Sequence, residues 1–168
     1  MKRILALGAV IMTIVAFSSC EKDDICVDGD TPLLVIGFYD VNDTTAAKKV
    51  TKLRVAGENQ QFTVNTVADR TDLDLIEIPL RINSPNTSFV LISNSATNSS
   101  NEETGNADIV TFNYDTNEVF VSRACGFIAN YENLSGTLGS DSDHWIQGVE
   151  IVKTTINDQA AAHVKIYH

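Results

Sequence analysis

Hydrophobic residues downstream of Cys26 recur mostly at every second position, and many of them are β-branched. A period of two places successive side chains on opposite faces of an extended chain, whereas an amphipathic helix needs a period near 3.6. Clusters of Asn, Asp, Ser, Thr and Gly separate these runs, as expected of turns between strands. The pattern therefore predicts an all-β chain with little helix.

Residues 33–39 form a continuous apolar run, which indicates a strand buried on both faces. The candidate strand over 74–82 has Ile76, Ile78, Leu80 and Ile82 on one side, and Pro79 places it at an edge or a bulge. Other candidates lie at residues 50–55, 61–67 and 88–93.

Two hairpins are expected in the second half of the chain. The first pairs 109–114 with 118–127 across the turn residues Asp115, Thr116 and Asn117, and the second pairs 147–156 with 163–167. The long polar segment over 94–107 has no aromatic anchor, and we interpret it as a mobile loop.

About seven to eight short strands without repeated helices predict an antiparallel β-sandwich of immunoglobulin-like or transthyretin-like type. A small β-barrel is the alternative. The 168 residues suffice for one domain, which we place at 32–168.

The N-terminus carries a different signal. Lys2 and Arg3 precede an uncharged apolar run over 4–17 that is too short to span a bilayer and is typical of a secretory signal peptide, here residues 1–19. Its ending, Ser18-Ser19-Cys20, resembles a bacterial lipoprotein signal. The resemblance implies cleavage before Cys20, acylation of this residue, and a membrane partner held through the lipid. An uncleaved anchor or ordinary signal-peptidase cleavage is the alternative.

Residues 20–31 then form a lipidated acidic tether. Its start, Glu21-Lys22-Asp23-Asp24, resembles the export signal of outer-membrane lipoproteins of the Bacteroidota, which implies a location at the cell surface. A simple charged spacer explains the same residues, and the periplasmic face of the membrane then stays open.

Lipidation of Cys20 leaves Cys26 and Cys125 as the only two thiols of the chain. In an oxidising compartment we expect a disulfide between them. A free buried pair or a redox site is the alternative, but no CxxC spacing occurs and neither cysteine has a neighbouring His.

The balance of acidic and basic residues indicates which classes of partner the domain can bind. The whole chain has 12 basic and 22 acidic residues, and removal of Lys2 and Arg3 with the signal leaves a net charge of about −12. Such a domain repels phosphate backbones, so nucleic acid is not an expected partner.

No motif of the common hydrolases, zinc enzymes or nucleotide-binding proteins occurs, and no cofactor or metal site is predicted. The segment Gly139-Ser140-Asp141-Ser142-Asp143-His144-Trp145 brings hydroxyls, carboxylates and an imidazole into one loop. A small extracytoplasmic hydrolase that uses His144 is therefore an alternative function. A polar turn that leads Trp145 into the core explains the same residues.

The whole chain resembles small uncharacterised lipoproteins of the Bacteroidota, a family known as a domain of unknown function. The resemblance rests on residues 18–26, on Thr111-Phe112-Asn113-Tyr114, on residues 121–126 and on residues 163–167. It implies a lipid-anchored β-rich domain and assigns no catalytic residue. We therefore expect a noncatalytic binding or assembly module at the outer-membrane surface, with a protein or glycan partner whose binding residues the sequence does not identify.

Overall fold

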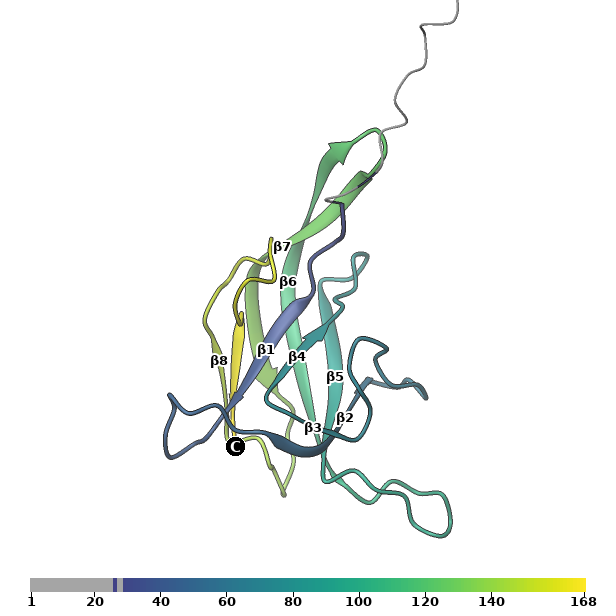
Figure 1. Ribbon diagram of the computed structural model, residues 1–168, viewed down its shortest axis with the longest axis vertical. Helices are drawn as coiled ribbons and strands as arrows, with labels where there is room; N and C mark the ends of the chain where they lie inside the picture. Colours follow the sequence, from purple (N-terminus) through teal and green to yellow (C-terminus); the bar gives the residue numbers. More distant parts are fainter. Residues whose placement is uncertain (1–25, 27–28) are drawn as a thin grey trace, which may run out of the picture.

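A computed structural model describes Cys26 and residues 29–168. Within this part of the chain, nine strands form two sheets (Figure 1). The strands are β1 (Leu34–Tyr39), β2 (Val50–Gly57), β3 (Thr71–Leu73), β4 (Leu75–Ile78), β5 (Asn86–Ser93), β6 (Asn106–Ser122), β7 (Gly126–Leu138), β8 (Gly148–Ile151) and β9 (Val164–Tyr167). Among the described residues, no helix is long and apolar enough to cross a membrane.

One sheet has four strands in the order β4-β1-β9-β8, and the other has five in the order β3-β2-β5-β6-β7. The sheets pack face to face over one core and do not close into a barrel, which confirms the prediction of an all-β, sandwich-like fold. Its largest fully buried side chains include Phe38, Phe112 and Tyr131. Pairing is antiparallel except between β1 and β9, which run parallel. The expectation of a wholly antiparallel sandwich is wrong at this pair.

The continuous apolar run forms β1, which is buried from Leu34 to Phe38 as its composition indicated. The candidate strand at 74–82 is instead divided. Residues 71–73 pair with β2 in one sheet and residues 75–78 pair with β1 in the other, so the chain changes sheets at Asp74. Ile76, Ile78 and Leu80 are buried, but Ile82 lies beyond the sheet and is exposed. Residues 61–67 form no strand, only the bridge between Thr63 and Ala56.

The second hairpin forms through antiparallel pairing of β8 and β9, but its first strand ends at Ile151 and not at residue 156 as predicted. The predicted turn at residues 115–117 is wrong, because β6 continues through it to Ser122. The side chains of Asp115 and Asn117 bind across the ladder instead, to Asn133 and Glu132. The chain turns only after Ser122, and Gly126 enters β7 with φ of +71°.

The β6–β7 hairpin is therefore longer than the sandwich and projects beyond it (Figure 1). A disulfide joins Cys125, at the turn of this hairpin, to Cys26, as predicted. The C-terminus lies at the opposite end of the molecule (Figure 1).

Candidate functional site

A hollow with a volume of about 490 Å³ lies beside Phe62 in the described part of the chain. It is bounded by the end of β2, the segment over 60–65, residues 79–81 after β4, and the start of β5. Leu80 and Phe89 are buried and give the hollow an apolar floor. Phe62 is 82% exposed, the highest value among the large hydrophobic side chains of the described residues. Its ring is therefore available to a ligand.

Two buried tyrosines fix one wall of this hollow. The hydroxyl of Tyr131 donates to the carbonyl of Leu80 at 3.1 Å, and that of Tyr114 donates to the carbonyl of Arg81 at 2.8 Å. The two rings pack edge to face with centroids 5.0 Å apart. Burial raises the pKa of Tyr131 to about 12 and also raises that of Tyr114, so both hydroxyls stay protonated and can donate.

The polar groups of the hollow suit binding better than catalysis. The polar residues that line it are Gln60, Thr63, Asn65, Arg81 and Thr87. No Asp, Glu, His or Cys belongs to this lining among the described residues, although the chain has 22 acidic residues. An exposed aromatic ring beside amide, hydroxyl and Arg side chains can hold a polar ligand, and the described lining offers no carboxylate, imidazole or thiol that could act as a general base.

The loop around His144 is organised by a buried carboxylate. Asp108 of β6 is fully buried, and its Oδ1 lies 3.2 Å from Nδ1 of His144. Its Oδ2 accepts the backbone N–H of Ile146 at 2.8 Å. The indole of Trp145 donates to the carbonyl of Leu91 and packs against the core, as a turn leading into the core requires.

His144 thus contacts a carboxylate from a separate strand, Asp108 of β6, but among the described residues neither of its ring nitrogens has a hydrogen bond to a hydroxyl group. Nε2 of His144 accepts the backbone N–H of Asp141 at 3.1 Å, so both ring nitrogens are engaged. A hollow of about 300 Å³ beside this loop is lined by Ser140 and Asp141, and His144 does not line it. The arrangement explains the conformation of the loop more directly than it explains a reaction.

Asp108, Asp141 and His144 each offer one ligand atom, and these atoms lie within 4.8 Å of one another. This is the one group of its kind among the residues that the structure describes. A cation there would have to displace a hydrogen bond from the imidazole. We therefore interpret the three side chains as a structural cluster.

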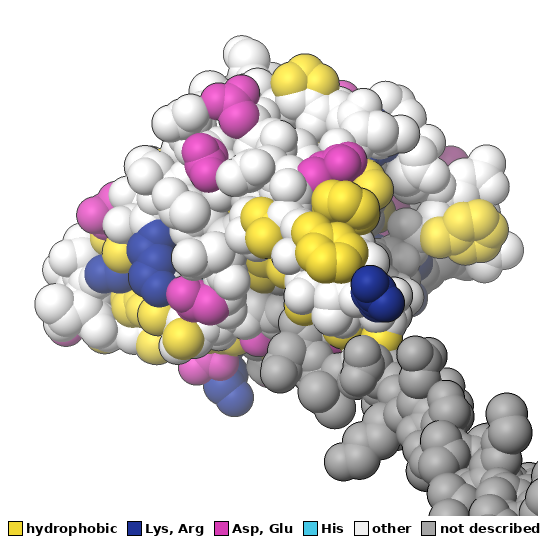
Figure 2. Space-filling view, turned by 90° about the horizontal axis from the view of Figure 1, so that it is seen from above, with side chains coloured by type: hydrophobic (Ala, Val, Ile, Leu, Met, Phe, Trp, Pro, Cys, Tyr) yellow, Lys and Arg dark blue, Asp and Glu magenta, His cyan; other side chains and the backbone are white. Residues whose placement is uncertain are grey.

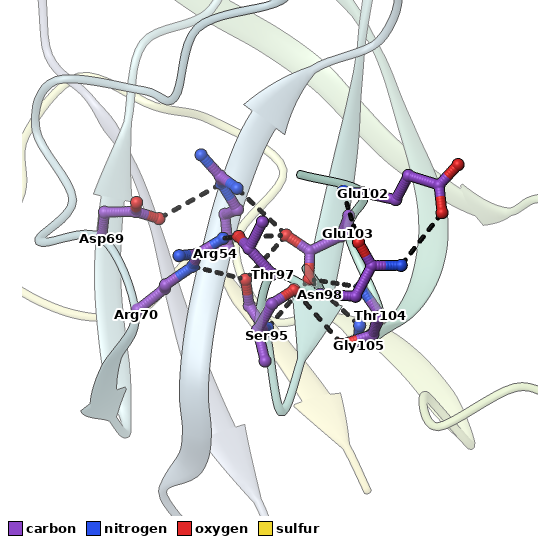
Figure 3. Close-up of polar contacts among 11 residues, drawn as sticks. Arg54, Asp69, Arg70, Ser95, Thr97, Asn98, Glu102, Glu103, Thr104 and Gly105 are labelled. Atoms are coloured by element: carbon purple, nitrogen blue, oxygen red, sulfur yellow. Dashed lines mark hydrogen bonds and ion pairs between the residues drawn. The ribbon is translucent and has the colours of Figure 1, made fainter. Parts of the chain in front are cut away.

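The polar segment over 94–107, whose last two residues belong to β6, is tied to β2 by hydrogen bonds and ion pairs (Figure 3). Glu103 lies at its centre and accepts hydrogen bonds from the backbone N–H groups of Ala96 and Gly105 and from the hydroxyl of Ser95. Arg54 of β2 contacts the same carboxylate at 3.0 Å, and Arg70 contacts it at 3.5 Å. Sequence reasoning missed this network because its members are far apart along the chain.

Cys20 lies outside the described residues, whereas Cys26 and Cys125 form the disulfide. Sequence reasoning also missed Phe62 and Arg81, since the apolar pattern assigns residues 61–67 and 74–82 to strands. The one available signal was an aromatic residue between polar neighbours, Gln61-Phe62-Thr63.

No curated protein and no solved structure matches this chain. Residues 52–168 match a protein family, and this match covers more than half of the chain and all of the hollow beside Phe62. The chain therefore belongs to DUF6452, a family of unknown function.

Proposed function

We propose that this protein is a lipid-anchored, noncatalytic binding module at the outer-membrane surface of a bacterium of the Bacteroidota, and that it binds a glycan in the hollow beside Phe62. The observation that carries the proposal is the Phe62 ring, 82% exposed at a hollow whose lining has hydrogen-bonding groups but no acid–base residue. A sugar ring presents apolar C–H faces and a rim of hydroxyls, which fits an aromatic ring flanked by amides.

The proposed cellular location of the protein rests on its N-terminal sequence. A basic start, an apolar run and the ending Ser18-Ser19-Cys20 support lipid attachment at Cys20. The acidic residues Glu21, Asp23 and Asp24 support display on the outer face. A disulfide between Cys26 and Cys125 fits an oxidising compartment.

Protease shaving of intact cells, with a lysed control and immunodetection of the domain, tests this address. Cleavage on intact cells supports surface display. Cleavage only after lysis places the protein on the periplasmic face and turns the search toward envelope-assembly partners. Release of the Cys20→Ala variant from the membrane fraction is the expected result for the anchor.

An array of bacterial surface polysaccharides and host-type glycans, probed with the detergent-solubilised mature protein, tests the ligand. We expect binding to at least one glycan class and a loss of roughly tenfold or more in Phe62→Ala, since aromatic anchors dominate binding energies. Phe120→Ala is the matched control, because Phe120 is also an exposed aromatic residue but does not line the hollow. Equal binding by wild type and Phe62→Ala would contradict the site.

A second candidate function, a small extracytoplasmic hydrolase, is favoured by one observation, the buried Asp108 carboxylate 3.2 Å from Nδ1 of His144. A carboxylate in this position orients an imidazole for use as a general base. Catalysis would require Nε2 to leave the N–H of Asp141. A screen against ester, amide and glycoside substrates tests it, and activity that is unchanged in His144→Ala would exclude this site.

A further inference from the structure

The free end of the β6–β7 hairpin is apolar on both faces. Phe120 and Phe127 are directly opposite one another on one face, with ring centroids 5.3 Å apart and exposed fractions of 55% and 67%. Val119 pairs with Ile128 on the other face, and Val119 is exposed as well. A hairpin surrounded by water usually has at least one polar face. The free end therefore has the composition of a surface that meets something apolar.

The face that carries Phe120 and Phe127 is the outward continuation of the core face. Along β7, Tyr131 and Ala129 are buried, and Phe127, at the next position on the same face, is not. Glu118 pairs with Ala129, and the four further residues to Ser122 extend the hairpin by about 13 Å at roughly 3.3 Å per residue. Figure 2 looks along the molecule onto this end, where hydrophobic side chains gather with basic side-chain atoms beside them.

The chain itself limits how far this end can lie from the proposed anchor. The disulfide joins Cys125, at the turn, to Cys26. Only six peptide steps separate Cys26 from Cys20, and such a segment spans at most about 22 Å when fully extended. If the lipid is on Cys20, Cys26 lies within this distance of the bilayer surface at all times, and Cys125 lies at most 4.9 Å further away, the Cα–Cα distance across the disulfide.

The net charge of the chain and the charge of Arg123 determine how the free end of the hairpin would contact the bilayer. The chain has a formal net charge of −10, so the domain as a whole is not drawn to an anionic membrane. Arg123, at the turn, is exposed and is the single cation between Ser122 and Gly126. Aromatic and aliphatic side chains beside one Arg match the interfacial zone, where rings lie among the acyl chains and the guanidinium stays with the phosphates.

We propose that the end of the β6–β7 hairpin, residues 119–128, inserts into the headgroup region of the bilayer that holds the lipid anchor and so fixes the orientation of the domain. The proposal rests on the proposed lipid at Cys20. The hollow beside Phe62 would then keep one presentation relative to the membrane instead of swinging on a free tether.

Tryptophan quenching in vesicles tests this contact. The natively lipidated protein, purified from membranes, is incorporated into vesicles of phosphatidylethanolamine and phosphatidylglycerol that contain phosphatidylcholine brominated in the upper acyl chain. Phe127→Trp is compared with Ser99→Trp, a control on the loop at the other end of the molecule, and the emission of Trp145, the single native Trp, is subtracted. We expect roughly half of the emission of the Phe127→Trp indole to be quenched, because interfacial side chains lie about 5–10 Å deep, and little quenching at position 99.

Trypsin cleavage after Arg123 gives a second measurement. In vesicles, we expect cleavage there to be roughly tenfold slower in wild type than in the double variant Phe120→Ser, Phe127→Ser, since burial of one Phe contributes a factor of about ten or more. Cleavage after the exposed Arg81 is the internal control and should not differ. Because both Phe side chains are largely exposed, the double variant should fold.

The outcomes separate this inference from the proposed function. Flotation in a density gradient shows whether the protein is bound to the vesicles. Protein that floats but shows no quenching at position 127 overturns the hairpin contact and leaves the lipid anchor supported. Sedimentation then shows whether a second copy covers the apolar end. Wild-type protein that does not float with the vesicles overturns both the hairpin contact and the lipid anchor. Loss of glycan binding in Phe62→Ala together with intact quenching supports two separate surfaces.

Discussion

The carboxylate of Glu103, in the loop between β5 and β6, lies 3.0 Å from the guanidinium of Arg54 in the middle of β2. The contact joins residues 49 positions apart. Burial disfavours the charge of Glu103, but hydrogen bonds from Gly105, Arg54, Ser95 and Ala96 outweigh this effect and lower its pKa to about 2. The loop is therefore held by one carboxylate that must be ionised.

Glu103→Gln should destabilise the protein by about 1–3 kcal/mol, because charge-assisted hydrogen bonds are lost. A lowered pKa means that this stability is present above the unfolded value of 4.5 and is lost as the pH falls from there toward 2. The difference in free energy of unfolding between wild type and variant should therefore shrink over this range, which urea denaturation at several pH values measures. Glu102→Gln is the control, since Glu102 accepts a side-chain bond only from Asn98.

The pattern of apolar residues was sufficient to predict most strands. The continuous run of β1 and the patterned positions of β2 and β5 are buried in the structure. Turns were harder to predict. Asp115 and Asn117 have ordinary turn chemistry, but Asn133 and Glu132 bind them across the ladder, and tertiary partners overrode the local preference. The parallel pairing of β1 with β9 joins the two ends of the domain, and no local pattern encodes such a contact.

The candidate sites show the same division. The disulfide followed from counting cysteines, because only one pair remained after Cys20. The hollow beside Phe62 could not be predicted from the sequence, since its walls come from four segments that only the fold brings together. Whether a single Phe is exposed depends on residues that are distant in the sequence, so the sequence alone does not reveal it.

Removal of the disulfide should destabilise the protein. The double variant Cys26→Ser, Cys125→Ser loses a crosslink between residues 99 positions apart, for which the chain-entropy model gives an upper value of about 4.7 kcal/mol. We expect a lower Tm in calorimetry, and a reductant should lower the Tm of wild type but not of the variant. Equal melting of the two proteins would show that the crosslink does not restrain the unfolded chain.

Gly29 should be required for this crosslink. A Cβ at position 29 would lie 2.6 Å from Sγ of Cys125 and would also overlap Sγ of Cys26. Gly29→Ala is therefore expected to raise the free-thiol content of the purified protein, measured by thiol titration under denaturing conditions. Gly148→Ala is a suitable control, because its nearest neighbour there would be 3.5 Å away. A fully oxidised Gly29→Ala protein would contradict this close packing.

Asp108→Ala should be among the more destabilising polar substitutions. It would leave the buried N–H of Ile146 and Nδ1 of His144 without their acceptor, at a cost of about 2–4 kcal/mol. His144→Ala should cost less, about 1–2 kcal/mol, because Asp108 keeps the bond from Ile146. Urea denaturation measures both. A larger loss in His144→Ala than in Asp108→Ala would show that the imidazole, not the carboxylate, organises the loop.

The imidazole of His163 should make stability depend on pH near neutrality. His163 is fully buried, and its Nδ1 accepts the backbone N–H of Val35 at 3.1 Å, which requires the neutral ring. Burial, with the charge of Lys153, lowers the pKa of His163 below its usual 6.5, so the unfolded chain takes up a proton that the folded chain refuses. Stability from this group is complete above the unfolded value and falls as the pH drops below it, by at most about 1.4 kcal/mol per pH unit.

His163→Gln retains an oxygen that can accept from Val35 but cannot take up a proton. Urea denaturation between about pH 5 and 8 should therefore show a shallower loss of stability on the acid side in this variant than in wild type. The pKa of His168 is also lowered, mainly by burial, so His168→Gln should remove a further part of the slope. A His163→Gln protein with the same pH dependence as wild type would show that the folded chain protonates this ring as readily as the unfolded chain does, and that the bond from Val35 does not keep it neutral.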